Sequence, residues 1–598
     1  MAENRKSKSY EVRVQAAELA KSRTHPRHES NGDEQRYSGA HYAMSFSKGL
    51  EHDKTTGLPK NPQHFEAFRQ AIDDGHIDAF NNRVPVPRTP TASYSVPKGK
   101  KLGRRFWEAP TAGVAYDLEG PDCQAVTMAP APALCSDELA FEMAEVYELA
   151  HVRDVPFSYW SGATTTNTRL KGSIDRLNSY SYAKNNFPVR PRTTNESGDL
   201  DSQTVFRGSS PGVEKGPYLS QFLLIGNDLT GFDGKSTVDK GQIGYGALQI
   251  SQKVPEAKPE VDYMTRWNDW LTVQEGFDVN DIAKDGGQEF TKKLRFITTP
   301  RDLATYVHFD ALYEAYLNAC LILLGMKTPF DPGFATLAGM RRSFPHSTWS
   351  AGHEPSAGGF ALYGGPHILT LVTEVATRAL KAARYQKFNV HNRARPEVLA
   401  ARLHKEPVLN KNYGNQFCSC ITDMCREIGD TLVVIEKQNG GRTNRLLPMA
   451  FREGSPMHPS YAAGHATVAG ACVTILKAFF DTGTVFVKPK KDSPAFIHPE
   501  KSAQGIAYTP NKKGTALDES SCECPLTLEG ELNKLAANIS IGRNMAGVHY
   551  FSDYYDSLRM GEEIAIGLLE EQALCYPTDP FVLSLPTFDG NTVRIGAR

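Results

Sequence analysis

The sequence has few of the features that mark secreted, membrane or nucleic-acid-binding proteins. Its formal net charge is only −1, from 67 Lys and Arg against 68 Asp and Glu, which gives no overall basic field to attract nucleic acid. No apolar run approaches the roughly eighteen residues of a membrane span, and the first residues lack the apolar core of a secretory signal. We therefore expect a soluble, intracellular protein that binds neither nucleic acid nor membranes.

Cysteine is also scarce, with ten residues in 598. The pairs Cys418/Cys420 and Cys522/Cys524 have one residue between them where zinc knuckles have two, and no histidines follow at regular spacing. Structural thiols are favoured, and a zinc site that also includes Cys425 is the weaker alternative. The chain contains neither a Walker A sequence nor a G-x-G-x-x-G turn after a strand, so no nucleotide-binding loop is visible.

The first half of the chain divides into two regions by composition. Residues 1–60 are polar and basic with few large apolar residues, which predicts a flexible N-terminal arm. Residues 61–298 predict a loop-rich region with helices, packed on the core and on neighbouring subunits. Within it, residues 226–241 are acidic but lack the glutamate that an EF-hand loop requires, so a solvated loop is favoured over a calcium site.

Helical periodicity dominates residues 299–598. Thr299-Pro300-Arg301-Asp302 is a strong helix start, with a capping hydroxyl, proline in the first turn and an acidic residue, and the helix is expected to run to about residue 324. Other helices are expected after Ser136 and near 366–389, 397–404, 414–427, 463–480, 526–543 and 550–570. Strand patterns are sparse. The predicted fold class is mainly α, a helical-bundle core with long loops, few short strands and an excursion at residues 482–521.

One stretch places two histidines before an apolar helix. Residues 455–480 read SPMHPSYAAGHATVAGACVTILKAFF, and the apolar spacing predicts a helix that begins near Ala463 or Gly464. The free amides and positive dipole end of such a helix favour an anion, and Gly464 has no side chain to obstruct it. His465 is placed to transfer a proton to that anion. Taken alone, this pattern is more often an ordinary turn with a half-exposed histidine.

Two other segments carry cations that need an explanation. Lys387 lies near a helix C-terminus, where lysine is a common partner of the dipole. Pro396 restricts Arg395 to an extended conformation, which fixes the direction of the guanidinium. Arg543 falls on the apolar face of its helix, where a charge requires a partner.

His549 and Asp553 are four residues apart, which is one turn if a helix begins there. The carboxylate would then hold one ring nitrogen and leave the other free to bind a ligand. A surface His/Asp pair is the simpler interpretation, but it does not account for a buried Arg543.

These three segments together resemble the signature of the vanadium-dependent haloperoxidases, which are related to type 2 phosphatidic acid phosphatases. Seven residues separate Lys387 from Arg395, and His458 lies seven before His465, as in the algal bromoperoxidases. The sequence of residues 378–397, RALKAARYQKFNVHNRARPE, is similar to the red-algal branch in particular. The specific motifs cover about residues 366–560.

The resemblance implies a role for each matching residue. Vanadate, one per subunit, would be bound by Lys387, Arg395, Gly464, Arg543 and, through vanadium itself, His549. His465 and His458 would act in catalysis together with Lys387, which polarises the bound peroxide, while Asp553 orients His549 and Arg384 belongs to the halide pocket. The implied reaction uses hydrogen peroxide to oxidise bromide and iodide to hypohalous acid, which halogenates small organic acceptors.

The chain departs from the family at Ala463, where serine is usual, so one hydroxyl bond to the oxyanion is expected to be missing. The resemblance further implies a large homo-oligomer, a dodecamer in the red-algal branch, and calcium whose ligands cannot be matched here. Two alternatives remain from the residues themselves. An acid phosphatase would use His549 as nucleophile and His465 as acid, because vanadate and phosphate share shape and charge. The other is a non-catalytic oxyanion-binding assembly protein.

Overall fold

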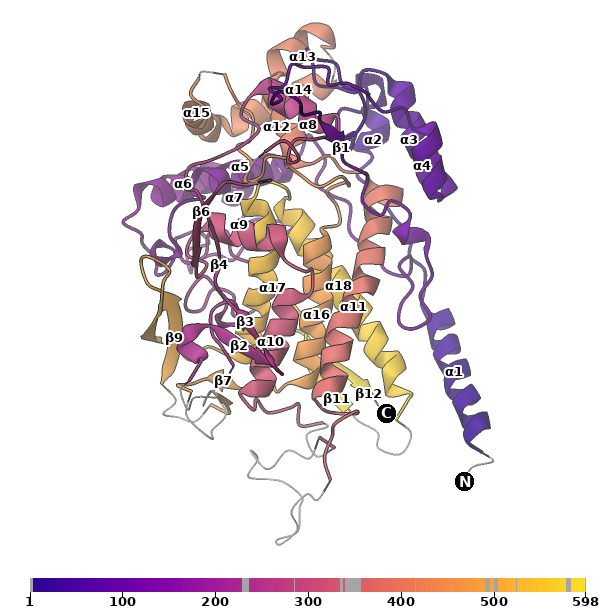
Figure 1. The fold of residues 1–598 in the computed structure, drawn as a ribbon, viewed down its shortest axis with the longest axis vertical. Coiled ribbons are helices and arrows are strands. Elements are labelled where there is room, and N and C mark those ends of the chain that lie inside the picture. Colours follow the sequence, from indigo (N-terminus) through magenta and orange to yellow (C-terminus); the bar gives the residue numbers. More distant parts are fainter. Residues whose placement is uncertain are drawn as a thin grey trace.

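The protein is mainly helical, as the sequence predicts, with few and short strands (Figure 1). Each strand of the described residues pairs with one other strand in a two-stranded antiparallel sheet. The computed structural model describes residues 4–227, 236–283, 286–333, 337–338, 357–414, 416–441, 443–489, 495–499, 504–522, 524–576 and 582–596.

Helix α16 (Gly464–Phe479) is the centre of the bundle, and His465 is its one residue that is not buried. It packs among α11 (Gly365–Tyr385), α17 (Leu528–Met545) and α18 (Phe551–Ala573) (Figure 1). The α16 and α18 backbones touch because each helix has a glycine at the crossing. A Cβ on Gly470 would lie 2.0 Å from the Leu558 carbonyl oxygen, and one on Gly561 would lie 2.0 Å from that of Thr467.

The remaining helices surround this bundle or lie above it in Figure 1. They are α1 (Arg5–Ser22), α2 (Asp33–Arg36), α3 (Pro62–Asp74), α4 (Ile77–Arg83), α5 (Asp137–His151), α6 (Thr168–Ser179), α7 (Ser181–Lys184), α8 (Trp267–Gln274), α9 (Pro300–Phe309), α10 (Glu314–Gly325), α12 (Pro396–His404), α13 (Glu406–Asn412), α14 (Gln416–Glu427) and α15 (Gly429–Gln438).

The paired strands connect surface loops. The pairs are β1 (Gly103–Arg104) with β5 (Phe277–Asp278), β2 (Gln242–Tyr245) with β3 (Leu248–Ser251), β4 (Val254–Ala257) with β6 (Phe290–Arg295), β7 (Val485–Phe486) with β8 (Phe496–Ile497), β9 (Gly505–Pro510) with β10 (Leu517–Cys522), and β11 (Val582–Pro586) with β12 (Thr592–Gly596). Four of these strands, β7 to β10, lie in the predicted excursion, which packs on the protein where Phe496 stacks on Phe222.

The single helix expected from residue 300 to about 324 is wrong. The chain breaks into α9 and α10, whose axes meet at 99°. Thr299 and Asp302 form the predicted capping box, but Asp310 is extended at ψ 146° and ends α9. The apolar pattern continues across this break, so periodicity alone did not reveal it.

The expectation of a flexible arm over residues 1–60 is also wrong for its second half. Residues 44–46 pair with 392–394 through backbone hydrogen bonds, from Phe46 N to Asn392 O at 2.8 Å and from Ala394 N to Met44 O at 3.2 Å. Lys48 is fully buried and forms an ion pair with Glu397 at 3.1 Å. The polar composition of this segment reflects buried ion pairs and backbone pairing more than exposure to solvent.

Two of the cysteines form a disulfide, whereas the sequence predicts thiols. Cys135 and Cys420 form a disulfide that connects residues 285 positions apart, so Cys420, one of the five cysteines of the zinc alternative, is not a thiol. Across the part of the chain that the structure covers, no group of three or more His, Cys, Asp and Glu residues is arranged to hold a metal ion. The centre of the acidic loop, residues 228–235, lies outside the described residues.

Among the described helices, none is by itself long and apolar enough to cross a membrane, and the bent pair α9 and α10 meets that criterion only in combination.

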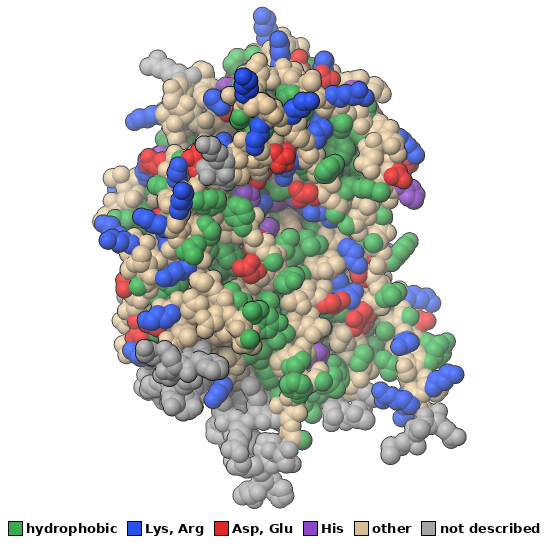
Figure 2. Space-filling model, in the orientation of Figure 1, with side chains coloured by type: hydrophobic (Ala, Val, Ile, Leu, Met, Phe, Trp, Pro, Cys, Tyr) green, Lys and Arg blue, Asp and Glu red, His purple; other side chains and the backbone are tan. Residues whose placement is uncertain are grey.

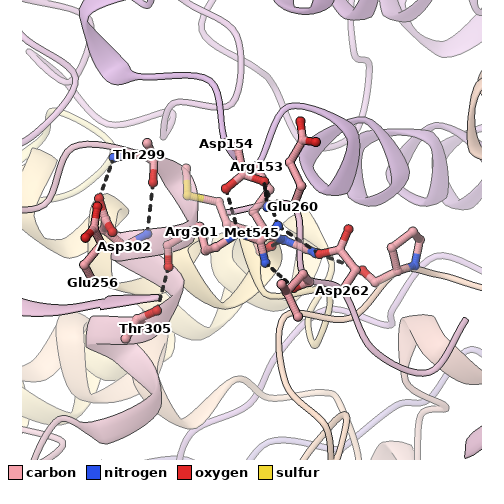
Figure 3. Close-up of polar contacts among 12 residues, drawn as sticks. Arg153, Asp154, Glu256, Glu260, Asp262, Thr299, Arg301, Asp302, Thr305 and Met545 are labelled. Carbon is pink, nitrogen blue, oxygen red and sulfur yellow. Dashed lines mark hydrogen bonds and ion pairs between the residues drawn. The ribbon is translucent and has the colours of Figure 1, made fainter. Parts of the chain in front are cut away.

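A buried ion-pair network fixes the end of α17, which leads into the candidate site (Figure 3). Arg153 donates from Nε to the Met545 carbonyl oxygen at 2.8 Å and pairs with Asp262 at 2.5 Å. Arg301 donates two bonds of 2.7 Å to Asp154 and one of 3.0 Å to Asp262. Both guanidinium groups are at most 2 % exposed, so the network joins α9, α17 and the loop before α8 without solvent.

Replacing Arg301 with methionine should lower the free energy of unfolding by about 3–5 kcal/mol, because the largely buried Asp154 loses its arginine partner and Asp262 keeps only Arg153. Urea denaturation at neutral pH measures the change. The matched control is Arg169→Met, which breaks the exposed Arg169–Glu260 pair and should change stability by less than about 1 kcal/mol. Equal effects of the two substitutions would contradict this interpretation.

The disulfide predicts how the protein reacts with iodoacetamide after denaturation. Without reductant, intact-mass measurement should show eight alkylated cysteines, and with reductant ten, because only Cys135 and Cys420 are paired. Peptide mapping should locate the two protected residues. Ten modifications without reductant would show that this bond is absent.

Candidate functional site

Three segments that are distant in sequence meet at the N-terminus of α16. They are the π-helical turn Gln386–His391 with the loop to Arg395, the loop before Gly464, and the connection from α17 to α18. Figure 2 shows histidine, acidic and hydrophobic side chains around a shallow hollow in this face of the molecule. The sequence-predicted residues therefore come together at one end of the bundle.

Asp553 connects these segments. It belongs to the capping box of α18, and its Oδ2 accepts from the Tyr550 amide at 3.1 Å and from His549 Nδ1 at 2.7 Å. The same oxygen accepts a short bond from the Ser460 hydroxyl, and Oδ1 accepts from Arg393 at 2.8 Å. Although burial opposes its ionisation, Arg393 and His549 hold the pKa of Asp553 below its usual value.

His549 is fixed in one tautomer by this contact. Nδ1 carries the proton donated to Asp553, which leaves the Nε2 lone pair free to accept. Nε2 lies 2.9 Å from Arg395 Nη1. Burial, followed by the charge of Arg395, lowers the pKa of His549 well below its usual value, so the ring is neutral and suited to bind an electrophilic centre.

Arg395 lies between the two predicted histidines. Its Nη1 also donates to the Val548 carbonyl at 2.7 Å, and its Nη2 lies 2.8 Å from His458 Nδ1. None of its hydrogen bonds goes to a carboxylate. Burial lowers the pKa of Arg395 to about 9, despite the opposing influence of Asp553, and burial also lowers the pKa of His458 well below its usual value.

Lys387 and Arg543 are two further buried cations whose hydrogen bonds end on backbone carbonyls. Lys387 Nζ donates to Pro459 O at 2.8 Å and Ser460 O at 2.9 Å, and Arg543 Nη1 donates to Val307 O at 2.7 Å. The Arg543 Nε atom is buried without a partner. Burial lowers the pKa of both groups, and nearby Arg395 adds to the effect at Lys387.

Helix α16 begins as predicted, with Ala463 as its N-cap and no side-chain cap. The Ala463 amide donates to the Ser557 hydroxyl at 2.8 Å. An added Cβ on Gly464 would lie 3.5 Å from Leu380, an ordinary contact, so crowding inside the protein does not by itself require glycine there.

His465 points to the break between α9 and α10, where its Nε2 lies 3.0 Å from Asp310 Oδ1. Arg384 has a different neighbour, Glu108, whose Oε2 lies 3.9 Å from Arg384 Nη2 and 3.4 Å from His458 Nε2. The ten predicted positions thus lie on the segments that surround the start of α16, and hydrogen bonds join His458, Arg395, His549 and Asp553 in one chain.

This set of donors fits an oxyanion. Lys387, Arg395 and Arg543 are buried cations without a carboxylate hydrogen bond, and desolvation lowers the pKa of each. A bound polyanion would supply the missing negative charge and an acceptor for the unpartnered Arg543 Nε. Helix amides and a neutral imidazole complete the donor set.

Sequence reasoning did not identify four residues that orient this site: Arg393, Ser460, Glu108 and Asp310. Arg393 lay in the quoted basic cluster two residues before Arg395, and this spacing puts both side chains on the same side of an extended chain, a usable signal. Ser460 had no signal beyond its place in the loop. Glu108 and Asp310 come from distant segments, and only tertiary structure brings them here.

Comparisons with known proteins agree with this geometry. The family model described as the second helical-bundle domain of VCPO matches residues 438–573. The chain is 39 % identical over 631 aligned residues to the vanadium-dependent bromoperoxidases of Corallina pilulifera and Corallina officinalis, and the alignment covers 99 % of this chain and of each relative. It is 29 % identical to that of Ascophyllum nodosum over 556 residues, covering 92 % of this chain and 86 % of the relative.

A solved structure is similar along nearly the whole chain. It is the homohexameric second vanadate-dependent bromoperoxidase of Ascophyllum nodosum, with a TM-score of 0.73 and 26 % identity, covering 99 % of this chain and 90 % of that one. Full-length identity to the Corallina enzymes, added to the shared bundle and the cationic site at its end, places this chain in the family of vanadium-dependent bromoperoxidases.

Proposed function

We propose that this chain is a vanadate-dependent haloperoxidase that uses hydrogen peroxide to oxidise bromide, and iodide, to hypohalous acid. The observation that carries the proposal is the imidazole of His549, which Asp553 orients and which burial and Arg395 keep neutral. It lies beside buried cations whose hydrogen bonds end on carbonyls and imidazoles. Hypohalous acid released at this site would then halogenate small organic acceptors.

Vanadate would be held by charge and by one ligand bond. His549 Nε2 would bind vanadium, while Lys387, Arg395, Arg543 and the Gly464 amide surround the oxygens. When bound, vanadate acts as a Lewis acid that activates peroxide toward a halide without changing its own oxidation state. For vanadium to bind at His549 Nε2, Arg395 would have to release its 2.9 Å contact with that atom and direct the freed donor to the anion.

The protein's own groups would manage protons and charge. His465, which the 3.0 Å contact of its Nε2 with Asp310 Oδ1 orients, would act as the group that accepts and returns a proton. Lys387 would offer a point charge to the anion, and that anion would favour its protonated form. His458 Nδ1 accepts from Arg395 Nη2 and so helps to orient that guanidinium beside the same oxygens.

Assembly and further ligands extend the proposal. The solved relative is a homohexamer, and we propose that this chain also forms a large homo-oligomer, as a hexamer or the dodecamer implied by the resemblance. Residues 61–298 would contribute to contacts between subunits. One vanadate per subunit and a structural calcium ion belong to the same proposal.

A direct assay separates this function from its alternatives. Purified protein with orthovanadate, bromide and peroxide should brominate monochlorodimedone. The same protein should leave p-nitrophenyl phosphate intact when peroxide is absent. His549→Ala should reduce bromide oxidation at least roughly a hundredfold, because it removes the only ligand to vanadium.

The matched control for that substitution is His404→Ala, since His404 is a half-buried histidine that contacts Thr443 and Trp267 away from the site. It should retain activity. Phosphate release alone would favour an acid phosphatase, and no reaction in either assay would favour a non-catalytic oxyanion-binding protein.

Restoring serine at position 463 should tighten vanadate binding. A hydroxyl at this N-cap can donate to the oxyanion, worth about 1 kcal/mol or somewhat more, or roughly a fivefold lower Kd. Titration of vanadate into the two vanadate-free proteins measures the difference.

Thermal unfolding without vanadate provides the control, because a serine N-cap can also stabilise α16. A higher Tm of Ala463→Ser with an unchanged or weaker vanadate Kd would contradict the prediction and assign the hydroxyl to helix capping.

A further inference from the structure

Glu108 is an acidic side chain at the edge of the cationic site, and the proposed reaction does not yet use it. It reaches the site from the N-terminal region, on the loop after β1. Its amide donates to the Met457 carbonyl at 3.1 Å, and its Oε1 accepts from the Met457 amide at 3.3 Å and lies 3.5 Å from Arg105. These contacts direct the second oxygen, Oε2, toward His458 and Arg384.

The Arg384 guanidinium has more N–H donors than it has acceptors nearby. Its side chain is 13 % exposed, and its one ion pair in the described structure is with Glu108 at 3.9 Å, which is beyond hydrogen-bond range. A guanidinium has five N–H groups, so a largely buried one without a close acceptor can bind a small anion. Burial lowers the pKa of Arg384, and Glu108 acts in the opposite direction.

We propose that Glu108 is a counter-ion that sets halide affinity by competing with halide for the Arg384 guanidinium. The inference rests on the proposed function and deepens it, because it assigns control of halide affinity to a residue outside the cationic cluster. A carboxylate beside Arg384 offsets the charge of the guanidinium and repels a second anion. Halide therefore binds only when its attraction to Arg384 exceeds its repulsion by Glu108.

The effect should depend on charge and not on shape. Glu108→Gln keeps the side-chain length and an oxygen that can accept from the Met457 amide, while it removes the negative charge. Bromide and iodide carry the same charge, so the two should respond in parallel. A role limited to holding the loop would instead be rescued by glutamine and leave halide affinity unchanged.

The control is Glu374→Gln on the same helix as Arg384. Glu374 pairs with Arg378 at 2.5 Å, and its side chain is 43 % exposed against 42 % for Glu108. The substitution therefore removes a carboxylate of similar exposure from an arginine on α11, and Glu374 itself lies ten residues, more than two turns, before Arg384. It should leave halide affinity as it is in the natural chain.

Two measurements test the proposal. Steady-state assays at saturating vanadate and peroxide should give a KM for bromide and for iodide that is roughly tenfold lower in Glu108→Gln, the order expected when one nearby like charge is removed. Glu374→Gln should leave both KM values unchanged.

The second measurement does not need turnover. Crystals of each variant without vanadate, soaked in graded bromide, should show an anomalous bromine peak beside Arg384 at lower concentration in Glu108→Gln. An unchanged or higher KM, a fall for only one halide, or equal bromide occupancy in the variants would overturn the proposal. If no variant oxidises bromide, the proposed function fails, and the soaked crystals still decide whether Glu108 controls anion binding.

Discussion

The structure of the site depends on keeping several positive charges in a dry interior without neutralising them. Lys387, Arg395 and Arg543 could each have been paired with a carboxylate, as Arg301 and Arg153 are a short distance away. Their donors end on backbone carbonyls and imidazoles instead. Carbonyl dipoles orient a cation without cancelling its charge. The site therefore keeps a net positive charge that a bound anion would neutralise.

Asp553 is a carboxylate inside the site, and its position explains why it does not neutralise the three cations. It lies on the far side of His549 from Arg395. Its two oxygens accept hydrogen bonds from four donors, among them Arg393 and Ser460. Its charge therefore orients the ring while the cations keep their own charge. Behind it, the glycines at the α16 and α18 crossing let the two helices that carry Gly464 and Asp553 pack backbone to backbone.

Much of this arrangement could be predicted from local sequence. Helix starts with clear chemistry, such as Thr299-Pro300 and Ala463-Gly464, appear where expected because capping and dipole effects act within one turn. The break at Asp310 and the buried segment at residues 44–46 were not predictable. Both depend on partners hundreds of residues away, and neither changes the apolar periodicity by which helices and cores are recognised.

The distance in sequence between Glu108 and Asp553 has a consequence for how the protein is made. A ribosome releases the chain from its N-terminus, so the loops that bear Lys387 and Arg395 emerge well before α18 and its carboxylate. The loop at residues 458–460, which supplies acceptors to both cations, follows next, and the ring of His549 emerges only later. The binding site is consequently among the last parts to assemble during synthesis, after the central helix has begun to bury its apolar surface.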